Sequence, residues 1–238
     1  EKALETLKLV NLEGYENRMP SELSGGQQQR VAVARAIVLE PKVLLFDEPL
    51  SNLDAKLRRQ VREDIREIQQ KLGVTTIYVT HDQEEALAIS DKVIVMNNAV
   101  IAQEGNPKDL YNFPKNKFVA NFIGDANVVK AEIINKQSNT YELKLAEINV
   151  KIECDNELNS SVSVALRPEK IEIKRSNDNN CIHATINNAS FVGSSYQYIL
   201  NSKLGKLYVI SNDTNDVFEV GEEVFLNLNE KDIRVLND

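Results

Sequence analysis

The sequence predicts an α/β layered region followed by an all-β region. In residues 1–126, short apolar runs alternate with helical patterns, which is typical of strands and helices arranged in layers. In residues 127–238, short segments rich in Val and Ile are interrupted by Asn, Ser, Asp and Gly, and several alternate polar and apolar residues. We therefore predict two domains, 1–126 and 127–238. The second is a small β-barrel or a pair of barrel-like sheets, although a β-sandwich fits the same pattern.

The first elements follow from apolar spacing. The run VLLF at 43–46 predicts a strand covered on both faces. The next segment predicts a helix that Gly73 ends, because its apolar residues are spaced 4, 4, 3 and 4 positions apart. The apolar residues are Leu57, Val61, Ile65, Ile68 and Leu72, and the polar face carries Arg58, Arg62, Arg66, Glu63 and Glu67.

Strands and helices continue to alternate after this helix. TTIYVT at 75–80 predicts the next strand, QEEALAI at 83–89 a helix and KVIVM at 92–96 a third strand. Two short helices follow, one opened by Pro107 after Asn106 and one over 118–123. The first region ends at Gly124.

Charge and composition exclude several classes of protein. The net charge is -8, with 16 Lys+Arg against 19 Asp+Glu in residues 1–126 and 12 against 17 in residues 127–238. Neither region is basic, so we expect no nucleic-acid partner. Cys154 and Cys181 lie 27 positions apart without a CxxC motif, so we expect ordinary thiols of a reducing compartment. No apolar run approaches the roughly 18 residues of a membrane span.

The beginning of the chain predicts a truncated protein. Glu1 stands inside an amphipathic pattern, and neither an initiator Met nor a signal peptide precedes it. We therefore treat truncation as an expectation of the sequence.

The stretch LSGGQQQR at 23–30 predicts the start of a helix. Ser24 is a good helix cap, and Gly25 and Gly26 leave the backbone N–H groups uncovered. These donors and the positive end of the helix dipole favour a bound phosphate. An ordinary capped helix explains the same residues, so both interpretations stay open at this point.

Candidate catalytic side chains follow the two strands. Asp47 comes where a strand end can present it to a metal ion, and Glu48 is placed to orient or deprotonate an attacking water. His81 follows the second strand, where α/β sheets bind ligands. A salt-bridged turn at 47–48 and a structural histidine are the alternatives. Asp54 is expected to cap the helix that begins near Ala55.

Together, these motifs resemble the ATP-binding subunit of ABC transporters. LSGGQQQR resembles the signature motif, VLLFDEP the Walker B strand with its adjoining glutamate, SNLD the D-loop and VTHD the switch-histidine loop. The order and spacing of the set make the match specific, and it covers residues 1–126. Residues 127–238 resemble the regulatory TOBE domain of importers, an OB- or barrel-like fold, through ALRPEKIEI and NNASFVGSSYQYIL.

The resemblance implies an ATPase of an ABC import system that uses ATP and Mg²⁺. It implies catalytic roles for Glu48 and His81, a metal role for Asp47, and nucleotide binding by Ser24, Gly25, Gly26, Gln27 and Asp54. Two such subunits stack head to tail, so Ser24, Gly25 and Gly26 contact a nucleotide held by the partner. The implied partners are a second ATP-binding subunit, membrane permease subunits and, indirectly, a solute-binding protein. The implied place is the cytoplasmic side of the plasma membrane, as a peripheral protein.

One part of the family pattern is missing. The Walker A loop, the adenine-stacking aromatic residue and the glutamine loop lie upstream of the signature motif, and none is present here. The resemblance thus implies a partial parallel sheet and a fragment that is inactive alone. A stand-alone regulatory or dimerisation module is the main alternative, and a non-transport ABC ATPase is another. The branch that serves ferric iron, polyamines, phosphonates, sulfate and sugars fits best, with a ferric-iron or phosphonate importer favoured.

Overall fold

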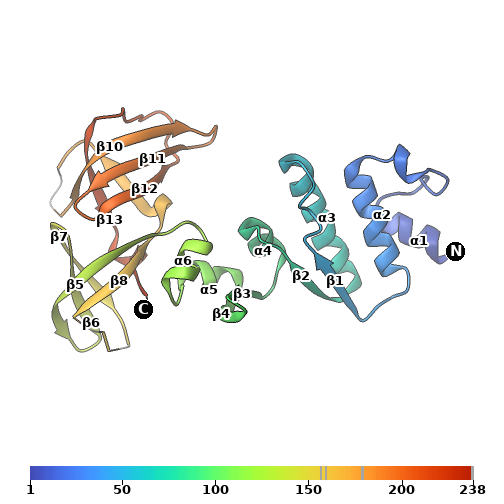
Figure 1. The fold of residues 1–238 in the computed structure, drawn as a ribbon, viewed down its shortest axis with the longest axis horizontal. Helices are drawn as coiled ribbons and strands as arrows, with labels where there is room; N and C mark the ends of the chain where they lie inside the picture. Colours follow the sequence, from blue (N-terminus) through green and yellow to red (C-terminus); the bar gives the residue numbers. More distant parts are fainter. Residues whose placement is uncertain (156, 159, 178–179, 237–238) are drawn as a thin grey trace. The chain divides into compact units, whose positions relative to one another are not determined.

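The chain divides into two compact units in the computed structural model. Unit 1 is Glu1–Val93 and unit 2 is Ile94–Asp238 (Figure 1). The structure describes residues 1–238 except 156, 159, 178–179 and 237–238. Within these described ranges, no helix has the length and apolar character needed to cross a membrane.

Unit 1 contains helices and a short parallel sheet. Strand β1 pairs with β2 in parallel, from Val43 opposite Thr75 to Asp47 opposite Val79. The elements are α1 (Lys2–Leu9), a 3₁₀ turn (Pro20–Glu22), α2 (Gly25–Ile37), β1 (Val43–Asp47), α3 (Ala55–Leu72), β2 (Thr75–Val79) and α4 (Gln83–Ile89).

The long helix α3 forms where the apolar spacing predicts it. Its Val61, Ile65 and Ile68 are buried and pack with residues of α2 and β1 in one core. Gly73 ends the helix in the left-handed region, with φ of 61°, which glycine adopts without the steric cost of a Cβ. The helix, its end and its cap at Asp54 are therefore confirmed.

The prediction that β1 is covered on both faces is wrong for the described residues. Leu44 is buried in the core, whereas Leu45 is 73% exposed. Leu45 lies opposite Ile77 in the parallel register. Val43, Leu45, Ile77 and Val79 are all exposed and form an apolar face, because the described helices pack only against the other side of this two-stranded sheet.

Unit 2 begins with two short strands and two short helices, which are followed by antiparallel strands. Its first elements are β3 (Val93–Asn97), β4 (Val100–Gly105), α5 (Pro107–Asn112) and α6 (Lys117–Phe122). The strands that follow are β5 (Asn127–Gln137), β6 (Thr140–Leu145), β7 (Ile148–Glu153), β8 (Ser161–Leu166), β9 (Ile171–Lys174), β10 (Ile182–Phe191), β11 (Tyr196–Ser202), β12 (Gly205–Ser211), β13 (Glu223–Leu228) and β14 (Arg234–Leu236), with 3₁₀ turns at Pro168–Lys170 and Glu230–Asp232.

Two five-stranded sheets make up most of unit 2. Their strand orders are β12-β11-β10-β13-β9 and β14-β8-β5-β6-β7, and both are antiparallel. The inward-facing residues of both sheets form one apolar core. The predicted combination of an α/β region with a pair of barrel-like sheets is confirmed. Cys154 and Cys181 are free thiols, as expected.

The third predicted strand forms, but its partner is β4. Asn98 and Ala99 connect β3 to β4, and both have positive φ, 49° and 62°. A two-residue connection with this conformation favours a tight hairpin. The local turn therefore pairs β3 with the strand that follows it.

Arg167 joins the α5–α6 segment to the sheets within unit 2. The guanidinium donates to the carbonyls of Ala120, at 3.1 Å, and of Ile123 and Tyr111. It also lies 4.0 Å from the centre of the Tyr111 ring, whose hydroxyl donates to Glu169. Arg167 is only 7% exposed. Burial lowers its pKa, while Tyr111 and Glu169 act in the opposite direction.

Gly124 allows this close approach. Its φ is +93°, and a Cβ there would stand 2.5 Å from a Tyr111 ring carbon and 2.8 Å from an Arg167 nitrogen. Only glycine leaves room for both side chains at this position.

Candidate functional site

The start of α2 is a capped helix end. The Ser24 hydroxyl accepts from the Gln27 amide at 3.4 Å, and the Gln27 side-chain oxygen accepts from the Ser24 amide at 2.9 Å. This reciprocal pair is a capping box. The Gln27 side-chain amide also donates to the Tyr15 hydroxyl at 3.3 Å. The capping prediction for Ser24 is thus confirmed, and the capped turn leaves Ser24 exposed.

The two glycines of this turn differ. Gly25 is exposed, and a Cβ there would make ordinary contacts at 3.6 Å or more. Gly26 is buried, and a Cβ there would stand 2.6 Å from the Leu57 side chain. Gly26 therefore allows α2 to pack closely against α3, while Gly25 leaves backbone at the surface.

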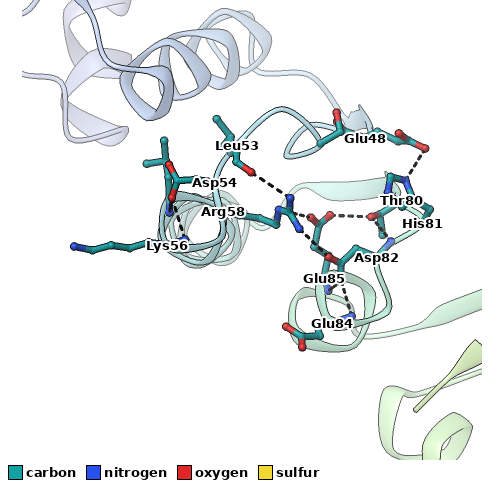
Figure 2. A network of polar contacts seen from close by, with 12 residues as sticks. Glu48, Leu53, Asp54, Lys56, Arg58, Thr80, His81, Asp82, Glu84 and Glu85 are labelled. Atoms are coloured by element: carbon teal, nitrogen blue, oxygen red, sulfur yellow. Dashed lines mark hydrogen bonds and ion pairs between the residues drawn. The ribbon is translucent and has the colours of Figure 1, made fainter. Parts of the chain in front are cut away.

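Glu48 and His81 meet beyond the ends of the parallel strands. The His81 Nδ1 lies 3.1 Å from the Glu48 Oε1, with the two side chains 73% and 46% exposed (Figure 2). The Glu48 amide donates to the Val79 carbonyl at 2.9 Å, which continues the pairing of β1 with β2. The structure therefore brings these two predicted residues together.

The backbone at Glu48 is unusual. Its φ is 44°, a left-handed conformation that few residues other than glycine adopt. Such strain is often found at functional sites, where the surrounding structure holds it. Asp47, the last residue of β1, is exposed next to this turn.

Asp54 caps α3. One carboxylate oxygen accepts from the amides of Lys56, at 3.1 Å, and Leu57, at 3.0 Å. Two orphan donors of the helix start are satisfied in this way. Among the described residues, no hydrogen bond or ion pair links Asp54 or the start of α2 to the Glu48–His81 pair.

A polar network supports the segment that carries His81. Glu85 is 3% exposed and accepts from the Thr80 hydroxyl at 2.8 Å (Figure 2). It also accepts from the Tyr78 hydroxyl at 3.0 Å. Burial, followed by the charge of Glu85, raises the pKa of Tyr78, which keeps its hydroxyl as a donor. Arg58 contacts Asp82 at 3.3 Å and the Leu53 carbonyl at 3.1 Å.

Sequence reasoning did not identify Arg58, Thr80 and Glu85 as a group. The helical pattern places Arg58 on a polar face, and it does not reveal a partner 24 positions away. Glu85 gives one usable signal, because it stands in the mainly apolar stretch EEALAI, where a carboxylate that faces the core requires polar partners.

Comparisons with known proteins give the family. Residues 1–51 match the family model described as ABC transporter, and residues 164–236 match the one described as TOBE domain. The Fe(3+) ions import ATP-binding protein FbpC of Agrobacterium fabrum is 44% identical over 237 residues, which is 100% of this chain and 67% of that protein. The chain belongs to the ATP-binding subunits of ABC importers.

Proteins of the same name from other bacteria are also similar to this chain. The protein of the same name from Brucella melitensis is 43% identical, with the same coverage. That from Fusobacterium nucleatum is 43% identical over 98% of this chain and 62% of its own length. Among solved structures, cbiO1 of Clostridium perfringens, described as part of the ABC transporter complex cbiONQ, matches with a TM-score of 0.44 and 36% identity over 46% of this chain and 43% of that chain.

Membership in the ABC family establishes the general activity. ABC ATP-binding subunits are ATPases, so the predicted class of enzyme is confirmed. The predicted TOBE domain is confirmed as well.

Proposed function

We propose that Glu48 and His81 form the catalytic pair of the ATPase and that hydrolysis drives uptake of a solute. The observation that carries this proposal is their 3.1 Å contact beyond the ends of β1 and β2. Ligands of open α/β sheets bind at this edge, outside the carboxyl ends of parallel strands. Both side chains are exposed enough to meet a substrate.

The proposed role of His81 requires a proton on each of its two nitrogens. Nδ1 lies 3.1 Å from the Glu48 Oε1, a contact that becomes an ion pair when the imidazole is protonated. In the imidazolium form, Nε2 would donate to a γ-phosphate oxygen and the positive charge would stabilise developing negative charge. Glu48 orients the attacking water and accepts its proton.

Asp47 is the proposed residue for Mg²⁺. Among the described residues there is no group of three His, Cys, Asp or Glu that would hold a metal ion alone. A single exposed carboxylate fits Mg²⁺, which is commonly held by one or two carboxylates together with waters and substrate phosphates. Bound Mg²⁺ would neutralise charge on those phosphates.

The start of α2 is the proposed contact for a nucleotide held by a second subunit. Ser24 caps this 13-residue helix, and the exposed Gly25 leaves its amide end accessible. Helix N-termini favour phosphate groups. Gly26 and Gln27 hold the turn, and Asp54 approaches the same nucleotide. We further propose that two such subunits form a homodimer and that this dimer binds membrane permease subunits. The protein would lie on the cytoplasmic side of the membrane as a peripheral protein.

Ferric iron is the proposed solute. Its support is the name of the relatives at 43–44% identity, which are ATP-binding proteins for Fe(3+) import. The permease subunits and a solute-binding protein would select the solute.

We also propose a functional boundary between residues 126 and 127, because β5, the first strand of the two large sheets, begins at Asn127.

Hydrolysis is tested in a complete subunit, meaning one in which a Walker A loop precedes residue 1. Glu48→Gln is expected to lower kcat by about 10²–10⁴-fold while ATP binding persists, since a general base contributes on that scale. Glu63→Gln, an exposed carboxylate on α3, is the matched control and should keep the parent rate. Hydrolysis by Glu48→Gln at the parent rate would refute the role of Glu48.

The missing loop and the solute need separate measurements. Calorimetry with Mg-ATP should show no binding to these 238 residues and tight binding to the complete subunit.

Uptake of radiolabelled ferric iron should restart when the complete subunit is returned to a deletion strain, and Glu48→Gln should not restore it. Restored phosphonate uptake without iron uptake would redirect the proposal to that solute.

A stand-alone binding module is the second candidate. Unit 2 contains a continuous core built from both large sheets, which favours independent folding. Mass measurement by light scattering separates the candidates. A dimer that forms without nucleotide supports the module, whereas dimerisation only with ATP in the complete subunit supports the ATPase.

A further inference from the structure

Arg58 connects the two loops that flank the Glu48–His81 pair. Its Nη2 donates to the Leu53 carbonyl at 3.1 Å, and its Nη1 donates to the Asp82 Oδ2 at 3.3 Å (Figure 2). Leu53 belongs to the connection between β1 and α3, and Asp82 directly follows His81. One side chain thus links segment 51–54 to the residue after His81.

Asp82 uses its two oxygens for different tasks. Oδ1 accepts from the amides of Glu84, at 2.8 Å, and Glu85, at 3.2 Å, and so caps α4. Oδ2 faces Arg58. A substitution that keeps the first oxygen and changes the second can therefore break the Arg58 contact without removing the cap.

His81 stands between two anchored residues. On one side, the Thr80 hydroxyl accepts from the Asp82 amide at 3.0 Å and donates to Glu85 at 2.8 Å. On the other side, Asp82 is held by Arg58. The His81 ring is mostly exposed, so its direction depends mainly on this backbone and on the contact with Glu48.

Glu85 requires a nearby positive charge. Its side chain is 4% exposed, and its Oε1 lies 3.9 Å from the Arg58 Nε. A buried carboxylate is stable when a cation and hydrogen bonds compensate it. The Arg58 Nε itself is buried without a hydrogen-bond partner among the described residues. Arg58 therefore has an unused hydrogen-bond donor, the Nε–H, on the side that faces Glu85.

We propose that Arg58 is a positioning residue, which holds His81 toward Glu48 and transmits the position of segment 51–54 to it. This inference rests on the proposed function of the Glu48–His81 pair. Arg58 acts through Asp82 and Glu85 and does not touch the nucleotide. The planar fork of arginine suits this task, because it donates in two fixed directions at once.

Kinetics of the complete subunit give the first test. Arg58→Ala is expected to lower kcat about 10–100-fold, with little change of KM for ATP, because a small misplacement of a catalytic group costs rates of this order. Arg58→Lys restores charge without the fork and should recover part of the loss. Arg59→Ala, an exposed arginine one position further on α3, is the matched control and should keep the parent kcat.

Asp82→Asn gives a second test that does not depend on Arg58→Ala folding well. It keeps a capping oxygen for α4 and turns an amide toward Arg58. The expected loss of kcat is similar to that of Arg58→Ala, and the double variant should lose little more, because both changes break one contact. Additive losses would overturn the proposal.

Imidazole NMR of the 238-residue chain tests positioning without ATP. The chain contains two histidines, His81 in unit 1 and His183 in unit 2. Arg58→Ala should shift the ring signals of His81 and leave those of His183 in place. Unchanged His81 signals with parent kcat would overturn the inference. If the unsubstituted complete subunit hydrolyses no ATP, the proposed function fails, and a shift of His81 still supports its positioning by Arg58.

Discussion

Arg58 in unit 1 and Arg167 in unit 2 are both arginines between segments that lie far apart in the sequence, but their surroundings differ. Arg167 is 7% exposed, and its guanidinium donates to three backbone carbonyls while it lies over the Tyr111 ring. The Arg58 side chain is 35% exposed and meets one carbonyl, one carboxylate and a second carboxylate beyond hydrogen-bond distance.

The difference separates a structural connection from an adjustable one. Carbonyl groups belong to the backbone, so the contacts of Arg167 fix the path of the chain at Tyr111, Ala120 and Ile123. Arg58 keeps a buried Nε without a hydrogen-bond partner in the part of the chain that the structure describes. A side chain with an unused donor can exchange partners when a loop moves. We therefore expect substitutions to reduce stability at Arg167 and to reduce activity at Arg58.

Arg167→Ala tests the structural side of the comparison and has the largest expected effect. The carbonyls of Tyr111 and Ile123 lose their donor, whereas that of Ala120 keeps the amide of Ala126 at 3.3 Å. Each buried acceptor left unpaired costs about 1–3 kcal/mol, so unit 2 should lose about 2–6 kcal/mol of unfolding free energy. Near-UV circular dichroism during urea unfolding reports on unit 2, because five of the seven tyrosines lie there. Arg175→Ala removes exposed contacts with Asp216, Glu222 and the Val217 carbonyl, and it should cost clearly less. Equal losses of unfolding free energy in Arg167→Ala and Arg175→Ala would contradict the structural role given to Arg167.

Gly124→Ala sharpens the comparison by filling the space beside Arg167. The left-handed φ costs about 1 kcal/mol for a residue with a Cβ, and the contact with Tyr111 raises the expected loss to about 2 kcal/mol. Gly193→Ala is a matched control, because its φ is +91° and nothing lies within 4 Å of the added Cβ. If urea unfolding shows the same loss of unfolding free energy for both variants, the close packing at Gly124 does not contribute to the stability of unit 2.

Asp54→Ala has the smallest expected effect and concerns the helix that carries Arg58. Loss of a helix cap costs about 1 kcal/mol, and Asp54→Asn should recover nearly all of it, since asparagine caps as well as aspartate does. Ellipticity at 222 nm reports on unit 1, which contains the long helices α2 and α3. In the complete subunit, a loss of kcat in Asp54→Asn at full stability would support the proposed contact with nucleotide.

Local structure could be predicted from the sequence where one segment contains all the information. The apolar stripe of α3, its end at Gly73 and its cap at Asp54 depend on neighbouring residues, and so does the capping box of Ser24. The meeting of Glu48 with His81 was suggested by two strand ends, because parallel strands present their carboxyl ends at one edge.

The remaining contacts could not be predicted because they join distant segments. Arg167 finds carbonyls 44 to 56 positions away, and backbone acceptors leave no trace in the sequence. The Arg58–Asp82 contact spans 24 positions and depends on how α3 and α4 approach each other. The pairing of β3 with β4 could have been suspected from Asn98, since asparagine tolerates the positive φ of a tight turn.

The apolar face of β1 and β2 has a practical consequence for the production of this chain. Two adjacent strands present an exposed apolar surface, which favours self-association. This surface consists of Val43, Leu45, Ile77 and Val79. Yield during expression would then depend on chaperone supply, growth temperature and protein concentration more than on the stability of either core. A dye that fluoresces on apolar surfaces would respond to the folded chain and respond less once Leu45 and Ile77 are replaced by threonine.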